Sequence, residues 1–189
     1  MINKTIKTFL TDLESTNANV TSGSACALIG STAISLAQKS ILLTQSAKEF
    51  NSYTNDRRSA LEEASMKLNT FKNNFDQLTS GYIKANESYQ KDPNESNLGV
   101  LVNASYSMAL TCIETIIAFD HLKDQLNKKY VNNLLIAIMN IKTVYEFCLI
   151  DIKSRATGNL SDDLADFLIQ KSKILSDAES VILYCERQI

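Results

Sequence analysis

The chain has 189 residues, a length that suits one domain with a sizeable hydrophobic core. Its 5 glycines and 1 proline supply few turns, so the composition argues against a many-stranded β protein and favours long helices. The formal net charge is −2, which leaves no basic surface of the kind that nucleic-acid binding needs. We therefore expect one all-α domain over residues 1–189, without a nucleic-acid partner.

The longest apolar stretches are interrupted by charged residues or by several serines and threonines, and we expect none of them to span a membrane. The N-terminal residues lack the apolar core of a signal peptide. The four cysteines are far apart in the sequence, and the chain has a single histidine. These features predict a cytoplasmic protein with reduced cysteines, no disulfide and no metal site.

Small residues dominate the stretch from residue 22 to 37, where they fill twelve of the sixteen positions. This predicts a helix that begins near Ser22 and that another backbone or a flat ligand can approach closely. The first turn of such a helix presents the unpaired N–H groups of Ser22, Gly23 and Ser24, a favourable site for an anion. The alternative is that the small residues serve a tightly packed contact between two helices.

The clearest pattern is an alternation of apolar residues at intervals of three and four, which forms the seam of a long helix. The seam consists of Leu61, Ala64, Leu68, Phe71, Phe75, Leu78, Tyr82, Ala85 and Tyr89. We predict a helix that begins after an N-cap at Asp56 and ends before the Asp92-Pro93-Asn94 loop. Gly81 lies inside it and costs about 1 kcal/mol relative to alanine, so it marks a weak point or a close contact.

Further helices are predicted over residues 5–14, 98–125 and 131–152, and from an N-cap at Ser161 to Arg187. The helix over 131–152 is apolar on most sides, which is typical of a buried, central helix. The expected architecture is a multihelical bundle of long antiparallel helices.

The common catalytic motifs are absent: there is no phosphate-binding loop, dinucleotide fingerprint or nucleophile elbow. Carboxylates beside the apolar faces are the better candidates, and they include Asp76, Glu114 and Asp151. For each of them the alternative is a solvated or ion-paired structural role. For Asp76 that alternative is a pair with Lys72, four residues earlier.

Four short segments resemble the cyclodeaminase/methenyltetrahydrofolate cyclohydrolase family, which includes the C-terminal half of formiminotransferase-cyclodeaminase. The family's Pro-Gly-Gly-Gly-Ser resembles residues 20–24, and its Asp-Glu-Asp resembles 76–78. Its Asn-Ala-(Val/Ile)-Ser-Asp resembles residues 129–133, and its Leu-Asn-Val-Arg-Ile-Asn resembles 150–155. The order of these segments follows the family over the whole chain.

Several motif positions differ from the family in ways that affect chemistry. Leu78 and Asn133 stand where the family has acids, whereas Asp151 stands where the family has an amide. Lys153 stands where the family has Arg, and it lacks the bidentate fork of a guanidinium. Asp76 is the first acid of the family's acidic stretch and is kept.

The resemblance implies an all-helical homodimer that acts on a tetrahydrofolate derivative, without a metal. It implies methenyltetrahydrofolate cyclohydrolase or formiminotetrahydrofolate cyclodeaminase activity. Asp76 and Asp151 are then the catalytic candidates. The candidates for substrate binding are Ser22, Gly23, Ser24, Asn133 and Lys153. Two alternatives stay open: a relative that binds folate without turnover, and a helical protein whose seams serve only oligomerisation.

Overall fold

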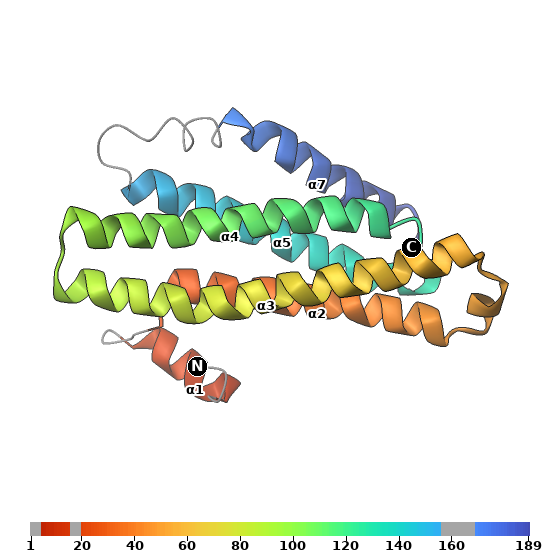
Figure 1. Cartoon of the computed structure of the whole chain (residues 1–189), viewed down its shortest axis with the longest axis horizontal. Helices are drawn as coiled ribbons and strands as arrows, with labels where there is room; N and C mark the ends of the chain where they lie inside the picture. The colour runs from red at the N-terminus through yellow and green to blue at the C-terminus, as the bar shows by residue number, and fades with distance from the viewer. Residues whose placement is uncertain (1–4, 16–19, 156–168) are drawn as a thin grey trace.

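The computed structural model describes residues 5–15, 20–155 and 169–189, and the elements and contacts below belong to these residues. They form six α-helices and no strand (Figure 1), which confirms the all-α prediction. The helices are α1 (Ile6–Glu14), α2 (Ser22–Ser46), α3 (Asn55–Lys91), α4 (Glu95–Leu122), α5 (Val131–Arg155) and α7 (Lys171–Glu186). Short 3₁₀ turns, η1 (Lys48–Ser52) and η2 (Lys128–Tyr130), precede α3 and α5.

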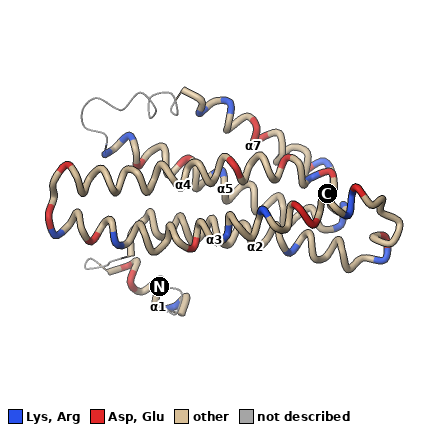
Figure 2. Tube along the Cα trace, viewed as in Figure 1, with Lys and Arg blue, Asp and Glu red and all other residues tan. Residues whose placement is uncertain are grey.

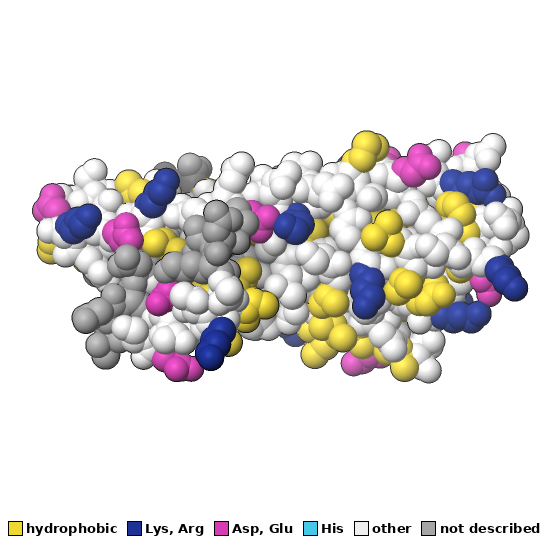
Figure 3. All heavy atoms as spheres, turned by 90° about the horizontal axis from the view of Figure 1, so that it is seen from below, with side chains coloured by type: hydrophobic (Ala, Val, Ile, Leu, Met, Phe, Trp, Pro, Cys, Tyr) yellow, Lys and Arg dark blue, Asp and Glu magenta, His cyan; other side chains and the backbone are white. Residues whose placement is uncertain are grey.

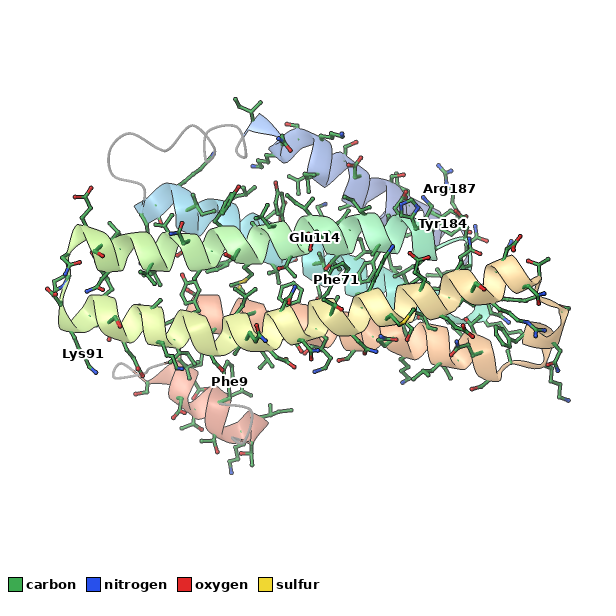
Figure 4. All side chains as sticks on the ribbon, viewed as in Figure 1. Phe9, Phe71, Lys91, Glu114, Tyr184 and Arg187 are labelled. Atoms are coloured by element: carbon green, nitrogen blue, oxygen red, sulfur yellow. The ribbon has the colours of Figure 1, made fainter. Side chains whose placement is uncertain are left out.

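Helices α2 to α5 form an antiparallel four-helix bundle, in which α2 contacts α3 and α5, and α4 contacts the same two helices. Helix α7 packs on α4 and α5. Helix α1 lies below the bundle in Figure 1 and has one buried residue, Phe9, which lies on the side of α1 that faces the bundle in Figure 4. The predicted helix start at Ser161 lies outside the described residues.

Side-chain caps set the starts of α1, α2, α3 and α4, and two of these starts differ from the prediction. Helix α2 begins at Ser22 as expected, because the Thr21 side chain accepts the N–H of Ser24. Helix α3 is capped by Thr54, so Asp56 lies in its first turn instead of at the cap. Helix α4 is capped by Asn94, which places the segment expected as loop, residues 95–97, in its first turn.

The small residues of α2 make room for aromatic rings of α3. A Cβ atom added to Gly23 would lie 2.2 Å from the ring of Tyr82, and one added to Gly30 would lie 2.5 Å from the ring of Phe75. The two glycines are seven residues apart, and so are the two aromatic residues. The apolar seam of α3 therefore packs against a face of α2 on which small residues recur at the same spacing. The packing alternative for this stretch is therefore present.

Gly81 makes no close contact with the described residues, because a Cβ atom added there meets nothing within 4 Å. Of the two alternatives predicted for Gly81, a weak point or a close contact, the close contact is therefore not found among the described residues. The close approaches lie instead at the two glycines of α2.

Helices α2 and α4 are long and apolar enough to cross a membrane by length and composition, with hydropathies of 1.4 and 1.5. This finding differs from the expectation that no segment is apolar enough to span a membrane. The reason is that serine and threonine lower the mean hydropathy of a helix less than charged residues do. Figure 2 shows how few charges α2 carries; Lys39 is the only one between residues 22 and 46. Both helices bury one side in the bundle, and a core helix passes the same test.

Candidate functional site

A buried carboxylate joins three helices at one end of the bundle. Asp151 on α5 accepts hydrogen bonds at Oδ2 from the hydroxyls of Tyr82 on α3, at 2.7 Å, and Ser105 on α4, at 2.6 Å. Its Oδ1 accepts a hydrogen bond from Nε of Arg155, one turn later on α5, at 2.9 Å. Asp151 is 6% exposed, so Arg155 supplies the opposite charge that a buried carboxylate requires.

Burial controls the protonation of the groups around this carboxylate. Burial, together with the hydrogen bond to Asp151, raises the pKa of the Tyr82 phenol well above its ordinary value. The hydroxyl therefore stays protonated and donates a hydrogen bond to Asp151. Burial and then the charge of Asp151 raise the pKa of the Cys26 thiol, on α2, to about 11. All four cysteines are free, and Cys26 stays neutral near pH 7.

Tyr82 also lines an open hollow of about 330 Å³ between α3 and α4, which we call the α3–α4 hollow. Helix α3 contributes Asn74, Gln77, Leu78, Gly81 and Tyr82, and α4 contributes Ala104, Ser107 and Thr111. These lining side chains are amides, hydroxyls and apolar groups, and none carries a charge. The volume falls within the range of about 300–1,000 Å³ typical of small-molecule sites.

A second open hollow of about 540 Å³ lies along the surface of α3, and we call it the α3 groove. It is lined by Asn73, Asp76, Gln77, Ser80, Gly81 and Lys84. Gln77 and Gly81 line both hollows, which are therefore neighbours on the same helix. In Figure 4 the labelled Phe71 and Lys91 bracket this stretch of α3.

Asp76 lies at the α3 groove and is held by two neighbours. Its Oδ1 accepts a hydrogen bond from the Ser31 hydroxyl of α2 at 2.7 Å, and its Oδ2 pairs with Nζ of Lys72 at 2.7 Å. The Asp76 side chain is 27% exposed, so it is only partly buried. The ion pair considered as the alternative is present, and the acid/base role of Asp76 stays a prediction.

Part of the predicted anion site at the start of α2 is occupied by the chain itself. The N–H of Ser24 donates to the Thr21 hydroxyl at 3.4 Å. The Ser24 hydroxyl accepts the N–H of Thr21 at 2.9 Å and donates to the Thr21 carbonyl at 2.8 Å. The ring of Tyr82 covers Gly23, and both Gly23 and Ser24 are buried. Ser22 is the exposed residue of the three predicted there.

The two predicted binding residues of α5 lie at opposite ends of that helix. Lys153 is exposed and lies two residues beyond Asp151. Asn133 lies eighteen residues before Asp151, a separation of about 27 Å at 1.5 Å per residue. The structure therefore does not bring Asn133 to the cluster around Asp151, because a straight helix keeps its two ends apart.

Ser105 and Arg155 are site residues that the sequence did not reveal. Arg155 follows Asp151 by four residues, a spacing that pairs opposite charges on a helix, and this signal was available. Ser105 has no such signal, because its contact depends on how α4 packs against α5. In the described residues no three His, Cys, Asp or Glu side chains gather in a way that could hold a metal ion.

Comparison with known proteins identifies the family of this chain and the class of its fold. The family model of formiminotransferase-cyclodeaminase matches residues 5–162, so the chain belongs to that family. Its structure is similar to the crystal structure of formiminotetrahydrofolate cyclodeaminase from Thermotoga maritima, with a TM-score of 0.77 and 15% sequence identity. That likeness covers 99% of this chain and 94% of the other, and at this identity it concerns the fold. No curated protein matches the sequence.

Proposed function

We propose that the protein is a folate-processing enzyme, a methenyltetrahydrofolate cyclohydrolase, and that the reduced folate binds at the α3–α4 hollow and the α3 groove. The observation that carries the proposal is a pair of carboxylates in different environments beside these hollows. Asp76 lines the groove and is open to water, whereas Asp151 is buried behind Tyr82. Such a difference lets two carboxylates take different roles.

The reaction needs one group that accepts a proton and returns it. Water attacks the methenyl carbon, a carbon–oxygen bond forms, and Asp76 takes the proton of the water. The bond from that carbon to a folate nitrogen then breaks, and Asp76 returns the proton to that nitrogen. The hydroxyl of the intermediate releases its own proton to solvent as the formyl carbonyl forms. Asp151 has its contacts within the protein, so we assign it a positioning role: it holds the Tyr82 ring at the wall of the hollow.

Hydrolysis fits these hollows better than cyclodeamination does. Cyclodeamination must relieve one folate nitrogen of a proton and protonate the departing ammonia. Asp76 is the one acid among the described residues that line the two hollows, and Leu78 occupies the family's second acidic position. A single accessible carboxylate suits water as the reactant.

The test offers the protein methenyltetrahydrofolate and formiminotetrahydrofolate in parallel. We expect faster loss of the methenyl absorbance than in buffer, and no release of ammonia from the formimino compound above the buffer rate. If the protein released ammonia from the formimino compound faster than it hydrolysed the methenyl compound, the proposed cyclohydrolase activity would be contradicted. No acceleration of either reaction would contradict the enzymatic proposal.

We also propose a cytoplasmic homodimer. Helix α1 exposes 76% of Ile6, 49% of Leu10 and 38% of Leu13, although these residues belong to its apolar face. Figure 3 shows further hydrophobic side chains on the right half of the lower surface of the molecule. A second copy that covers such surface would remove it from water. The free cysteines are in keeping with a reducing compartment.

A further inference from the structure

Gly81 has no packing reason to be a glycine within the described chain. It lies inside α3 in an exposed position, and a Cβ atom added there meets nothing within 4 Å. Glycine in an exposed helix interior costs about 1 kcal/mol relative to alanine. At Gly23 and Gly30 an aromatic ring takes the space of the missing side chain, and at Gly81 that space is empty.

The empty space lies where the two hollows meet. The α3–α4 hollow and the α3 groove share Gly81 and Gln77, so a ligand that fills both must pass over α3 at this point. A helix with its side chains is about 10–12 Å wide, and its side chains form a ridge between the hollows on its two flanks. Glycine lowers that ridge by a full side chain.

The two hollows differ in the chemistry that they offer. The α3–α4 hollow presents the amides of Asn74 and Gln77, which both donate and accept hydrogen bonds and suit a neutral heterocycle. The α3 groove presents Lys84, which makes no ion pair among the described residues, whereas Lys72 is engaged with Asp76. A ligand that spans both needs a neutral, hydrogen-bonding head and an anionic part.

We propose that a reduced folate lies across α3 at Gly81, with its bicyclic ring in the α3–α4 hollow and its glutamate carboxylates at Lys84. This rests on the proposed function and adds the path of the substrate over the helix. Asp76 lies in the same groove as Lys84, so a folate that crosses there passes beside the acid/base residue.

The experiment compares Gly81→Ala with Gly99→Ala. Gly99 lies in α4, also has open space around an added Cβ atom, and lines neither hollow, so it is a matched control. Binding of 5-formyltetrahydrofolate is measured by titration calorimetry, and thermal unfolding is followed for each variant. Both substitutions should raise the melting temperature, because alanine favours a helix. Gly81→Ala alone should weaken binding, by about tenfold or more, since one methyl group in the path of a ligand costs that much.

A second pair of variants tests the anionic end. Lys84→Gln should weaken binding several-fold at low salt and less at high salt, because an exposed charge is screened. Lys91→Gln, seven residues further on α3, lines neither hollow and should bind as the wild type does.

The outcomes separate the path from the function. Unchanged affinity of Gly81→Ala, in a wild type that binds folate, would overturn the crossing and leave the proposed function in place. A wild type that binds no folate would overturn both. A change of oligomeric state in Gly81→Ala without a change of affinity would make Gly81 a subunit contact and would also overturn the crossing.

Discussion

Gly30 is a glycine because the ring of Phe75 takes the place of a side chain. An added Cβ atom would lie 2.5 Å from that ring, which is fully buried. Gly30→Ala should therefore destabilise the protein by about 1–3 kcal/mol, the range for overpacked cores. Urea unfolding measures this loss. A variant as stable as the wild type would show that α2 and α3 can move apart here to accept the extra methyl group without loss of stability.

The thiol of Cys26 should make stability fall at high pH. Burial and the charge of Asp151 raise its folded-state pKa to about 11 from 9.0. Between these values the unfolded chain has lost the proton and the folded chain has kept it, so stability is present below pH 9 and declines toward pH 11.

Urea unfolding at a series of pH values measures this decline. Cys26→Ser should make it shallower but should not abolish it, because burial also raises the pKa of Cys185 to about 11. An equal decline in wild type and variant would exclude Cys26 as a contributor.

Among the elements, α2 and α3 show what the sequence could predict and what it could not. The periodic apolar residues of α3 predicted its existence and buried face, and Leu61, Leu68, Phe75 and Tyr82 are buried. The N-cap of α3 is Thr54 and not Asp56. Several neighbouring polar residues can cap a helix, and the path of the chain before the helix decides which of them does so.

Pairing between elements needed the structure. The seven-residue step of Gly23 and Gly30 continues to Ala37 and Thr44, and all four residues are buried. This step is a signal in the sequence for a partner helix with large residues at the same spacing. Which helix faces it is decided by the packing of the whole bundle, as is the meeting of Ser105 with Asp151.

The guanidinium of Arg57 ties the start of α3 to the segment that follows α4. Arg57 donates to the carbonyls of Gln125 and Leu126, each at 3.1 Å, and lies 3.7 Å from the ring centre of Tyr53. Arg57→Lys keeps the charge but loses the planar fork, so we expect a loss of about 1.5–3 kcal/mol, the scale of hydrogen bonds to charged groups. Thermal unfolding measures it, with the exposed Lys48→Ala as the control. Equal melting temperatures would show that the contacts add no stability.

For the whole molecule, the exposed apolar face of α1 bears on assembly. We expect light scattering at micromolar concentration to return the mass of a homodimer. Replacement of Ile6 and Leu10 by serine should shift the mass toward the monomer, because both side chains are exposed in the single chain. A wild type that scatters as a monomer would contradict the dimer.

The order of segments along the chain predicts the family and the helical bundle. The same segments predict only part of the candidate site. The motif position of Asp151 predicts a site residue, but its burial behind Tyr82 depends on contacts among three helices. The motifs alone place Asn133 in the same site, and the length of α5 separates the two residues.

In the proposed reaction, Asp76 exchanges a proton with the water that opens the methenyl bridge. The direct measurement is the rate of loss of methenyl absorbance with wild type, with Asp76→Asn, and with Glu62→Gln as a control on the same helix outside both hollows. We predict that wild type and Glu62→Gln exceed the buffer rate equally, and that Asp76→Asn loses about a hundredfold or more of the acceleration. Full acceleration in Asp76→Asn, or a wild type no faster than buffer, would show that Asp76 does not carry the acid/base step.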